Sequence, residues 1–138
     1  MKPANFLRAP AEPEQLEAAT LWLTRLARDL SLDDQMILRM QLVFEELFLN
    51  TLRHGYTEKG NHIMELALEV EAGHAWLIYT DYAPPFDFSQ KLEALGPVDP
   101  KREGGKGLYL IRDLPVAFEY QALQPGNRLR LRFDFARP

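Results

Sequence analysis

The segment from Val43 to Tyr56 carries a carboxylate, an amide and an imidazole, each four residues after the one before it. They are Glu46, Asn50 and His54, and residues four apart on a helix lie on the same face. The opposite side of this helix is apolar at helical spacing, which predicts that it is buried. The apolar positions are Met40, Val43, Phe44, Leu47, Phe48 and Thr51. A carboxylate and an amide beside an apolar stripe suit a pocket for a magnesium-bound nucleotide. By itself the segment also allows an ordinary polar helix face.

A second group of candidate residues is a glycine cluster ahead of a short apolar segment. Gly104, Gly105 and Gly107 flank Lys106, and Leu108 follows them. Glycine has no Cβ to block close approach, and free amides at a helix start carry partial positive charge, so the pattern favours a phosphate site. The spacing fits neither the P-loop nor the dinucleotide fingerprint. A flexible hinge with a solvated lysine is the alternative.

The third candidate is Asp81, which ends a predicted buried strand and precedes a segment with two prolines. A carboxylate held rigidly at the floor of a pocket can accept a hydrogen bond from the exocyclic amine of adenine, and it rejects the carbonyl of guanine. The alternative is an aspartate that caps its own turn. His54 and His74 have no third ligand at metal spacing, which argues against a zinc site.

Length and composition exclude several classes of protein. The chain has 138 residues, which predicts one domain over residues 1–138. Sixteen basic and twenty acidic residues give a net charge of −4, which argues against nucleic acid or an anionic membrane as a partner. Cysteine is absent, and no apolar run approaches the roughly 20 residues of a membrane span. We therefore expect a cytoplasmic protein.

Periodicity predicts the elements that position these groups. Helical spacing predicts one helix over 13–30, a second that ends at about His54 before Gly55, and a short third helix over 108–114. A shorter helical pattern occurs at 89–95. Ser31 and Asp34 are expected to end the first helix and cap the second. Alternation predicts strands at 5–8, 63–71, 74–81, 116–122 and 128–135.

This order of elements predicts an α/β (α+β) two-layer sandwich with a mostly antiparallel sheet and helices on one face. The long stretch from 82 to 102 is interpreted as a functional loop, with a lid at about 87–106. Arg128, Arg130 and Arg132 alternate with apolar residues, which predicts a solvated outer face of the last strand, with a surface for an acidic partner as the alternative.

Four motifs occur in order along the chain: Glu46-x-x-x-Asn50-x-x-x-His54-x-Tyr56, Asp81-x-x-x-Pro85-Phe86-Asp87, Gly104-Gly105-x-Gly107-Leu108-x-Leu110-Ile111 and Gly126-Asn127-Arg128-Leu129. Together they resemble the GHKL ATPase superfamily in its anti-sigma-factor serine kinase branch, from about Leu30 onwards. The resemblance implies a Bergerat-type fold that binds ATP and Mg²⁺. It also implies a protein-serine kinase that phosphorylates a STAS-type anti-anti-sigma partner, silences a sigma factor and forms a homodimer.

The resemblance assigns roles to individual residues. Glu46 matches the catalytic base, Asn50 the magnesium ligand and Asp81 the carboxylate that reads adenine. Gly105 and Gly107 match the glycines that face the phosphates. The other residues implied around the nucleotide are Phe86, Gly104, Lys106 and Leu108.

One position departs from the family pattern. Ala83 stands where the family commonly has glycine, so we expect the backbone to approach the adenine less closely. The main alternative function is a nucleotide-binding regulatory module that sequesters a sigma factor or another regulator with little or no kinase activity. A histidine-kinase ATP domain separated from its dimerisation helices is a third reading, which the strand and helix expected after Met1 disfavour.

Overall fold

The computed structural model describes residues 5–55, 62–99 and 107–135. Five antiparallel strands form one sheet in the order β1-β2-β3-β5-β4. The strands are β1 (Phe6–Pro10), β2 (Ile63–Glu71), β3 (His74–Asp81), β4 (Ala117–Leu123) and β5 (Gly126–Asp134). The helices are α1 (Leu16–Asp29), α2 (Asp34–Asn50), α3 (Phe88–Glu93) and α4 (Gly107–Asp113), with a 3-10 turn η1 (Pro13–Gln15) and a π-helical turn η2 (Thr51–Gly55).

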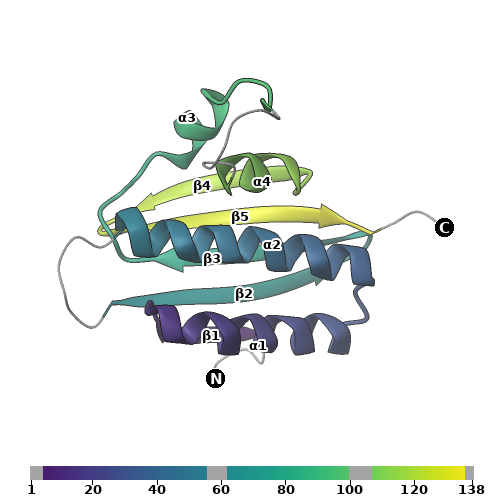
Figure 1. The fold of residues 1–138 in the computed structure, drawn as a ribbon. Coiled ribbons are helices and arrows are strands. Elements are labelled where there is room, and N and C mark those ends of the chain that lie inside the picture. Colours follow the sequence, from purple (N-terminus) through teal and green to yellow (C-terminus); the bar gives the residue numbers. More distant parts are fainter. Residues whose placement is uncertain (1–4, 56–61, 100–106, 136–138) are drawn as a thin grey trace.

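The elements form two layers, as the sequence predicts. Figure 1 shows α1, α2 and α4 lying over one face of the sheet, whereas α3 lies beside β4 and α4. The predicted two-layer α/β sandwich with an antiparallel sheet is therefore confirmed. In the described part of the chain, no helix has the length and hydropathy needed to span a bilayer.

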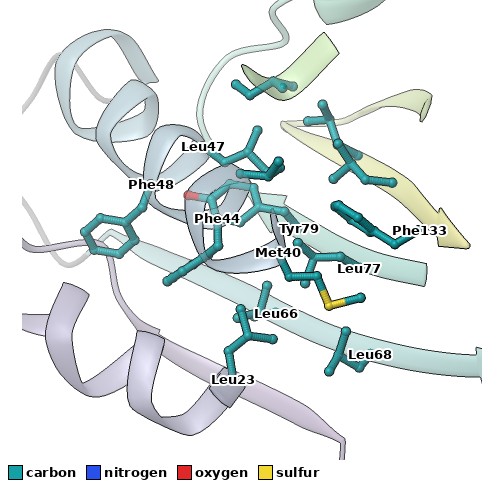
Figure 2. Close-up of a cluster of buried hydrophobic side chains, with 14 of the residues drawn as sticks. Leu23, Met40, Phe44, Leu47, Phe48, Leu66, Leu68, Leu77, Tyr79 and Phe133 are labelled. Atoms are coloured by element: carbon teal, nitrogen blue, oxygen red, sulfur yellow. The ribbon is translucent and has the colours of Figure 1, made fainter. Parts of the chain in front are cut away.

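The apolar side of α2 forms the centre of the core. Every residue predicted on that side is buried, and the Phe44 ring contacts the rings of Phe48 and Tyr79 at centroid distances of 5.8 and 6.2 Å. Figure 2 shows these side chains packed against leucines of β2 and β3. Burying a side chain of this size stabilises the fold by roughly 1.5–3 kcal/mol. Rotation of α2 about its axis would expose this face, so the core fixes where the polar face points.

Antiparallel pairing places the end of β3 beside the start of β5. β2 and β3 pair from Glu71↔His74 to Met64↔Asp81, and β3 and β5 pair from His74↔Asp134 to Asp81↔Asn127. The end of β3 and the start of β5 thus lie at the same end of the sheet as the C-terminal end of α2 (Figure 1).

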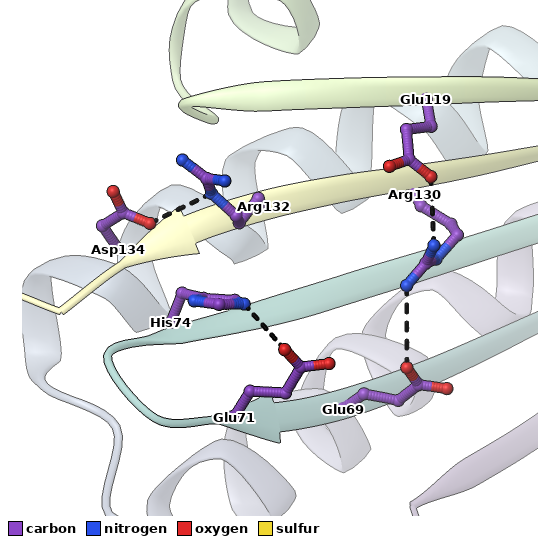
Figure 3. A network of polar contacts seen from close by, with 7 residues as sticks. All are labelled: Glu69, Glu71, His74, Glu119, Arg130, Arg132 and Asp134. Carbon is purple, nitrogen blue, oxygen red and sulfur yellow. Dashed lines mark hydrogen bonds and ion pairs between the residues drawn. The ribbon is translucent and has the colours of Figure 1, made fainter.

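The sheet face opposite the helices carries the predicted arginine row. Arg130 forms ion pairs with Glu119 of β4 at 3.0 Å and Glu69 of β2 at 3.8 Å, and its guanidinium lies 4.5 Å from the centroid of the Trp76 ring. Figure 3 shows the two ion pairs of Arg130, together with the pair of Arg132 and Asp134. The row does lie on the outer face, but it is not simply solvated: Arg130 pairs across strands, and Arg132 pairs with Asp134 of its own strand. Arg128 donates to the Thr80 hydroxyl of β3 at 3.2 Å.

The end of α2 differs from the sequence prediction. The α-helical pattern stops at Asn50, and residues 51–55 continue as a π-helical turn instead of an α-helix to His54. At this point the Thr51 hydroxyl donates to the Leu47 carbonyl at 3.0 Å. Thr20 and Thr24 make the same kind of bond within α1 without such a change, but the Thr51 hydroxyl also lies 3.0 Å from the Asp81 carboxylate, a contact outside the helix.

The junction between α1 and α2 also differs from the prediction. The N-cap of α2 is Asp33, whose Oδ1 accepts a hydrogen bond from the Met36 N–H at 2.8 Å. Ser31 instead takes a left-handed backbone conformation with φ of 62°, and Leu32 N–H bonds the Ala27 carbonyl at 3.0 Å. This bonding ends α1 in the way that helices commonly end with glycine.

The left-handed conformation of Ser31 predicts a stabilising substitution. Replacing Ser31 by Gly should raise the free energy of unfolding by about 1 kcal/mol, since an L-residue with a Cβ is strained at positive φ. Urea denaturation measures the change. The matched control is Ser89→Gly in α3, which should lower stability by about 0.5 kcal/mol because Ser89 lies within a helix. Equal effects of the two substitutions would contradict the prediction.

Candidate nucleotide site

Asp81 is a buried carboxylate, only 4% exposed, at the end of β3. Its Oδ1 accepts hydrogen bonds from Asn127 Nδ2 at 2.9 Å and from the Ala83 N–H at 3.3 Å, and its Oδ2 accepts one from Thr51 Oγ1 at 3.0 Å. The Ala83 bond means that Asp81 does cap its own turn, which the sequence left open. A carboxylate oxygen accepts two bonds, so Oδ1 is saturated, whereas Oδ2 has one donor among the described residues and room for another.

Thr51 connects the end of α2 to this carboxylate. Its Oγ1 lies within hydrogen-bond distance of the Leu47 carbonyl, Asp81 Oδ2 and, at 2.7 Å, the Tyr79 hydroxyl. The single hydroxyl hydrogen of Thr51 is shared between the Leu47 carbonyl and the Asp81 carboxylate, since neither of these groups can donate. The Tyr79 hydroxyl therefore donates to Thr51. The π-helical turn thus begins at a residue that fixes Asp81.

Asn127 belongs to this candidate site, although reasoning from the sequence assigned it no role there. It is 2% exposed and begins β5 opposite Asp81. Its Nδ2 also donates to the Pro84 carbonyl at 3.2 Å, and its Oδ1 accepts from the Phe86 N–H at 2.7 Å and the Tyr120 hydroxyl at 2.6 Å. The signal for it was the Gly126-Asn127 pair at the start of a strand, but its contacts depend on the register of β3 with β5.

Two further features support this arrangement. Burial raises the pKa of Tyr120, and the negative charges of Asp87 and Asp81 act in the same direction, although the Phe86 backbone opposes them. The hydroxyl therefore stays protonated and donates at neutral pH. Gly126 has φ of 137°, and a Cβ there would lie 2.6 Å from the Asp81 carbonyl oxygen, so β5 approaches β3 this closely because the residue is glycine.

Glu46 and Gly107 meet where α2 contacts the start of α4. A Cβ added at Gly107 would collide with Glu46 Oε2 and lie 2.9 Å from its Cδ, so the absence of a side chain at Gly107 leaves room for the carboxylate. α2 and α4 pack against each other, and the half-buried Leu108 packs against the core. Two predicted site residues that are far apart in sequence are thus brought together.

The other predicted residues fall around these two groups or outside the described part. Asn50 is the half-buried last residue of α2, one helical turn after Glu46 and directly before Thr51. Phe86 is 36% exposed, and its ring packs edge-on against Phe88 at 4.9 Å. Gly104, Gly105 and Lys106 lie outside the described residues, and so does the side chain of His54.

The fold and this arrangement agree with a comparison against known families. The family model of the histidine kinase-like ATPase domain matches residues 9–133. The chain belongs to this family, and the predicted resemblance to GHKL ATPases is confirmed.

Comparison with individual proteins finds relatives that are named as protein kinases. The chain is 32% identical over 124 residues to the serine-protein kinase RsbW of Bacillus pumilus, covering 84% of this chain and 76% of the relative. It is 31% identical over 114 residues to the protein of the same name from Bacillus subtilis, covering 78% of this chain and 71% of the relative. A crystal structure of the RsbU and RsbW domains of Rv1364c from Mycobacterium tuberculosis shares the fold, with a TM-score of 0.64 at 16% identity. That match covers 99% of this chain and 34% of the other.

The contacts of Thr51 predict a cost for removing its hydroxyl. Thr51→Val keeps the shape but removes a donor to the buried Asp81, so the free energy of unfolding should fall by about 1–3 kcal/mol in urea denaturation. The control is Thr20→Val, because the Thr20 hydroxyl bonds the Leu16 carbonyl of its own helix. That change should stay within about 0.5 kcal/mol. A Thr51→Val protein as stable as the control would remove Thr51 from the support of Asp81.

Proposed function

We propose that this protein is an ATP-dependent protein-serine kinase that acts as an anti-sigma factor. The substrate is a STAS-type anti-anti-sigma protein, and the other partner is a sigma factor bound by a homodimer. One observation carries the proposal: a single helix, α2, has Glu46 against the start of α4 and is followed directly by Thr51, which holds the buried Asp81. The names of the relatives, serine-protein kinase, support the choice of protein serine as the acceptor.

The nucleobase end of the site is formed by Asp81. Its Oδ2 has room for one more donor, and the exocyclic amine of adenine is a donor of the right kind. Guanine presents a carbonyl at that position, which would leave a buried acceptor facing another acceptor. This supports ATP over GTP. The methyl group of Ala83 is buried, at 1% exposure, where the family commonly has glycine.

The phosphate end is formed by Glu46 and the segment that ends at Gly107. In the proposed reaction the serine hydroxyl oxygen bonds to the γ-phosphorus while the bond from that phosphorus to the bridging oxygen of ADP breaks. The serine proton passes to the Glu46 carboxylate, which acts as general base. Because Gly107 has no Cβ, the carboxylate keeps its position between α2 and α4. We propose that the nucleotide is also faced, beside Glu46, by Gly104, Gly105, Lys106 and Leu108. Phe86 is proposed to face it at the nucleobase end.

Asn50 is proposed to hold Mg²⁺. Its amide oxygen is a hard ligand of the kind this ion prefers, and it lies on the same helix as Glu46 with its side chain half-buried. In the part of the chain that the structure describes, no three acidic or histidine side chains cluster as metal ligands. This fits an ion that takes most of its ligands from phosphates and water. When bound, Mg²⁺ offsets the negative charge of the phosphates.

A phosphorylation assay with a matched pair of variants tests the kinase assignment. Purified protein, labelled ATP and a STAS protein should yield phosphoserine, and Glu46→Gln should reduce the rate by at least ~100-fold while ATP still binds, since only the base is lost. Glu45→Gln is the control, because the neighbouring Glu45 lines the groove between α1 and α2 instead. It should retain the activity. Wild-type protein that binds ATP but leaves no phosphate on serine would favour a regulatory module without kinase activity.

A second prediction concerns the metal. Asn50→Ala should remove the Mg²⁺-dependent part of ATP affinity, because an apolar methyl group cannot replace the amide oxygen. Calorimetric titration with ATP in the presence of Mg²⁺ and of EDTA measures that part. Leu38→Ala, at a position 55% exposed on the same helix, should leave it unchanged. If Mg²⁺ strengthens ATP binding equally in the Asn50 variant and the wild type, Asn50 is not a ligand.

A further inference from the structure

All the hydrogen-bonding positions of the Asn127 amide are used, and only one orientation of the amide allows these bonds. Its Nδ2 donates to Asp81 Oδ1 and to the Pro84 carbonyl, and its Oδ1 accepts from the Phe86 N–H and the Tyr120 hydroxyl. An amide group has two donor and two acceptor positions, so none is unused. The carboxylate and the carbonyl can only accept, and the backbone N–H can only donate. Flipping the amide would therefore break three of the four bonds.

Three of these partners lie on one short segment of chain between β3 and α3. Asp81, Pro84 and Phe86 are all bonded to a single side chain of β5. Pro84 and Pro85 have no N–H, so this segment has fewer donors of its own with which to form a hydrogen-bonded turn. The amide of Asn127 supplies bonds that the segment cannot make internally. It therefore fixes the path of the chain from the end of β3 to Phe86.

Asn127 also determines which oxygen of Asp81 remains available. With Ala83 it saturates Oδ1, and Thr51 holds Oδ2 from the other side. Rotation of the carboxylate would break these bonds in a buried environment, where an unpaired charged group is costly. The oxygen with a free acceptor position is thus held in one place.

We propose that Asn127 is the positioning residue for the nucleobase, which orients Asp81 toward the exocyclic amine of adenine and holds Phe86 beside the same end of the site. This inference rests on the proposed ATP site. It assigns the preference for adenine to a pair of side chains, Asp81 and Asn127, one from each of two adjacent strands. Asn127 acts through Asp81 and the segment that ends at Phe86.

The test replaces the donor without changing the shape. Asn127→Asp puts an oxygen where Nδ2 faces Asp81 and the Pro84 carbonyl, so repulsion turns the Asp81 carboxylate away from its position. Calorimetric titrations with ATP and with GTP give the dissociation constants, and thermal unfolding shows that the variant is folded. ATP affinity should fall about tenfold, as expected for a lost hydrogen bond to a charged group, with GTP affinity changed less than about twofold.

The matched control is Gln121→Glu. It makes the same change from amide to carboxylate on the exposed side of β4, opposite Arg128 in register and outside the proposed site. It should leave the ratio of ATP to GTP affinity unchanged. If Asn127→Asp does not fold, Asn127→Ala removes the same donor without adding a charge, and the affinity ratio is expected to fall in the same way.

The outcomes separate this inference from the proposed function. A fall in the ATP to GTP ratio for the Asn127 variant, and not for the control, supports the positioning role. A variant that melts earlier but keeps the wild-type ratio shows that Asn127 only stabilises the fold, and this overturns the inference while the ATP site stands. Wild-type protein that binds no adenine nucleotide overturns the proposed function and the inference together.

Discussion

The burial of one charge constrains this end of the molecule more than any other interaction. A carboxylate removed from water costs several kcal/mol unless donors replace its hydration, so Asp81 requires fixed partners. These come from the end of α2, the start of β5 and the turn that follows β3. Three segments that are distant in sequence must therefore meet at one point. The strand order, with β3 between β2 and β5, makes that meeting possible.

Helix α2 contributes to both the core and the site. Its buried face, centred on Phe44, packs against the sheet, and this packing orients Glu46 toward α4 and Thr51 toward Asp81. The polar residues need no separate support because the core already fixes the rotation of the helix. The change from α-helical to π-helical bonding at Thr51 occurs at the residue where the helix meets the carboxylate. Such local changes in helix type are frequent at functional sites.

Most of the fold could be predicted from the sequence because its signals are local. The alternation in β2 and β3 and the apolar spacing of α2 depend on residues a few positions apart, and the bounds of β2 and β3 agree with the prediction. The N-cap of α2 was assigned to Ser31 instead of Asp33, because the residue type of Ser31 does not indicate its left-handed backbone conformation. Glu46, Gly107 and Asp81 were selected by their motifs, and their roles in the site stay predictions.

Other parts of the candidate site depend on long-range geometry. Asn127 stands in the fourth motif, but residue type does not indicate its contacts, because it gains its partners only when β5 pairs with β3 in one register. The sharing of the Thr51 hydroxyl with Tyr79 likewise follows from packing between layers. The roles proposed for Gly104, Gly105 and Lys106 remain predictions from the motif, since these residues lie outside the described part of the chain.

The position of β1 bears on how the chain folds. This strand lies at the edge of the sheet, and it pairs with β2 from Phe6↔Ala67 to Pro10↔Ile63, so the whole of α1 and α2 separates the two partners in sequence. Closing so long a loop costs more entropy than forming the β2–β3 hairpin. The stabilisation that β1 gains is limited, because it pairs with one neighbouring strand. The amide hydrogens of β1 should therefore become protected late during refolding and exchange early from the native state.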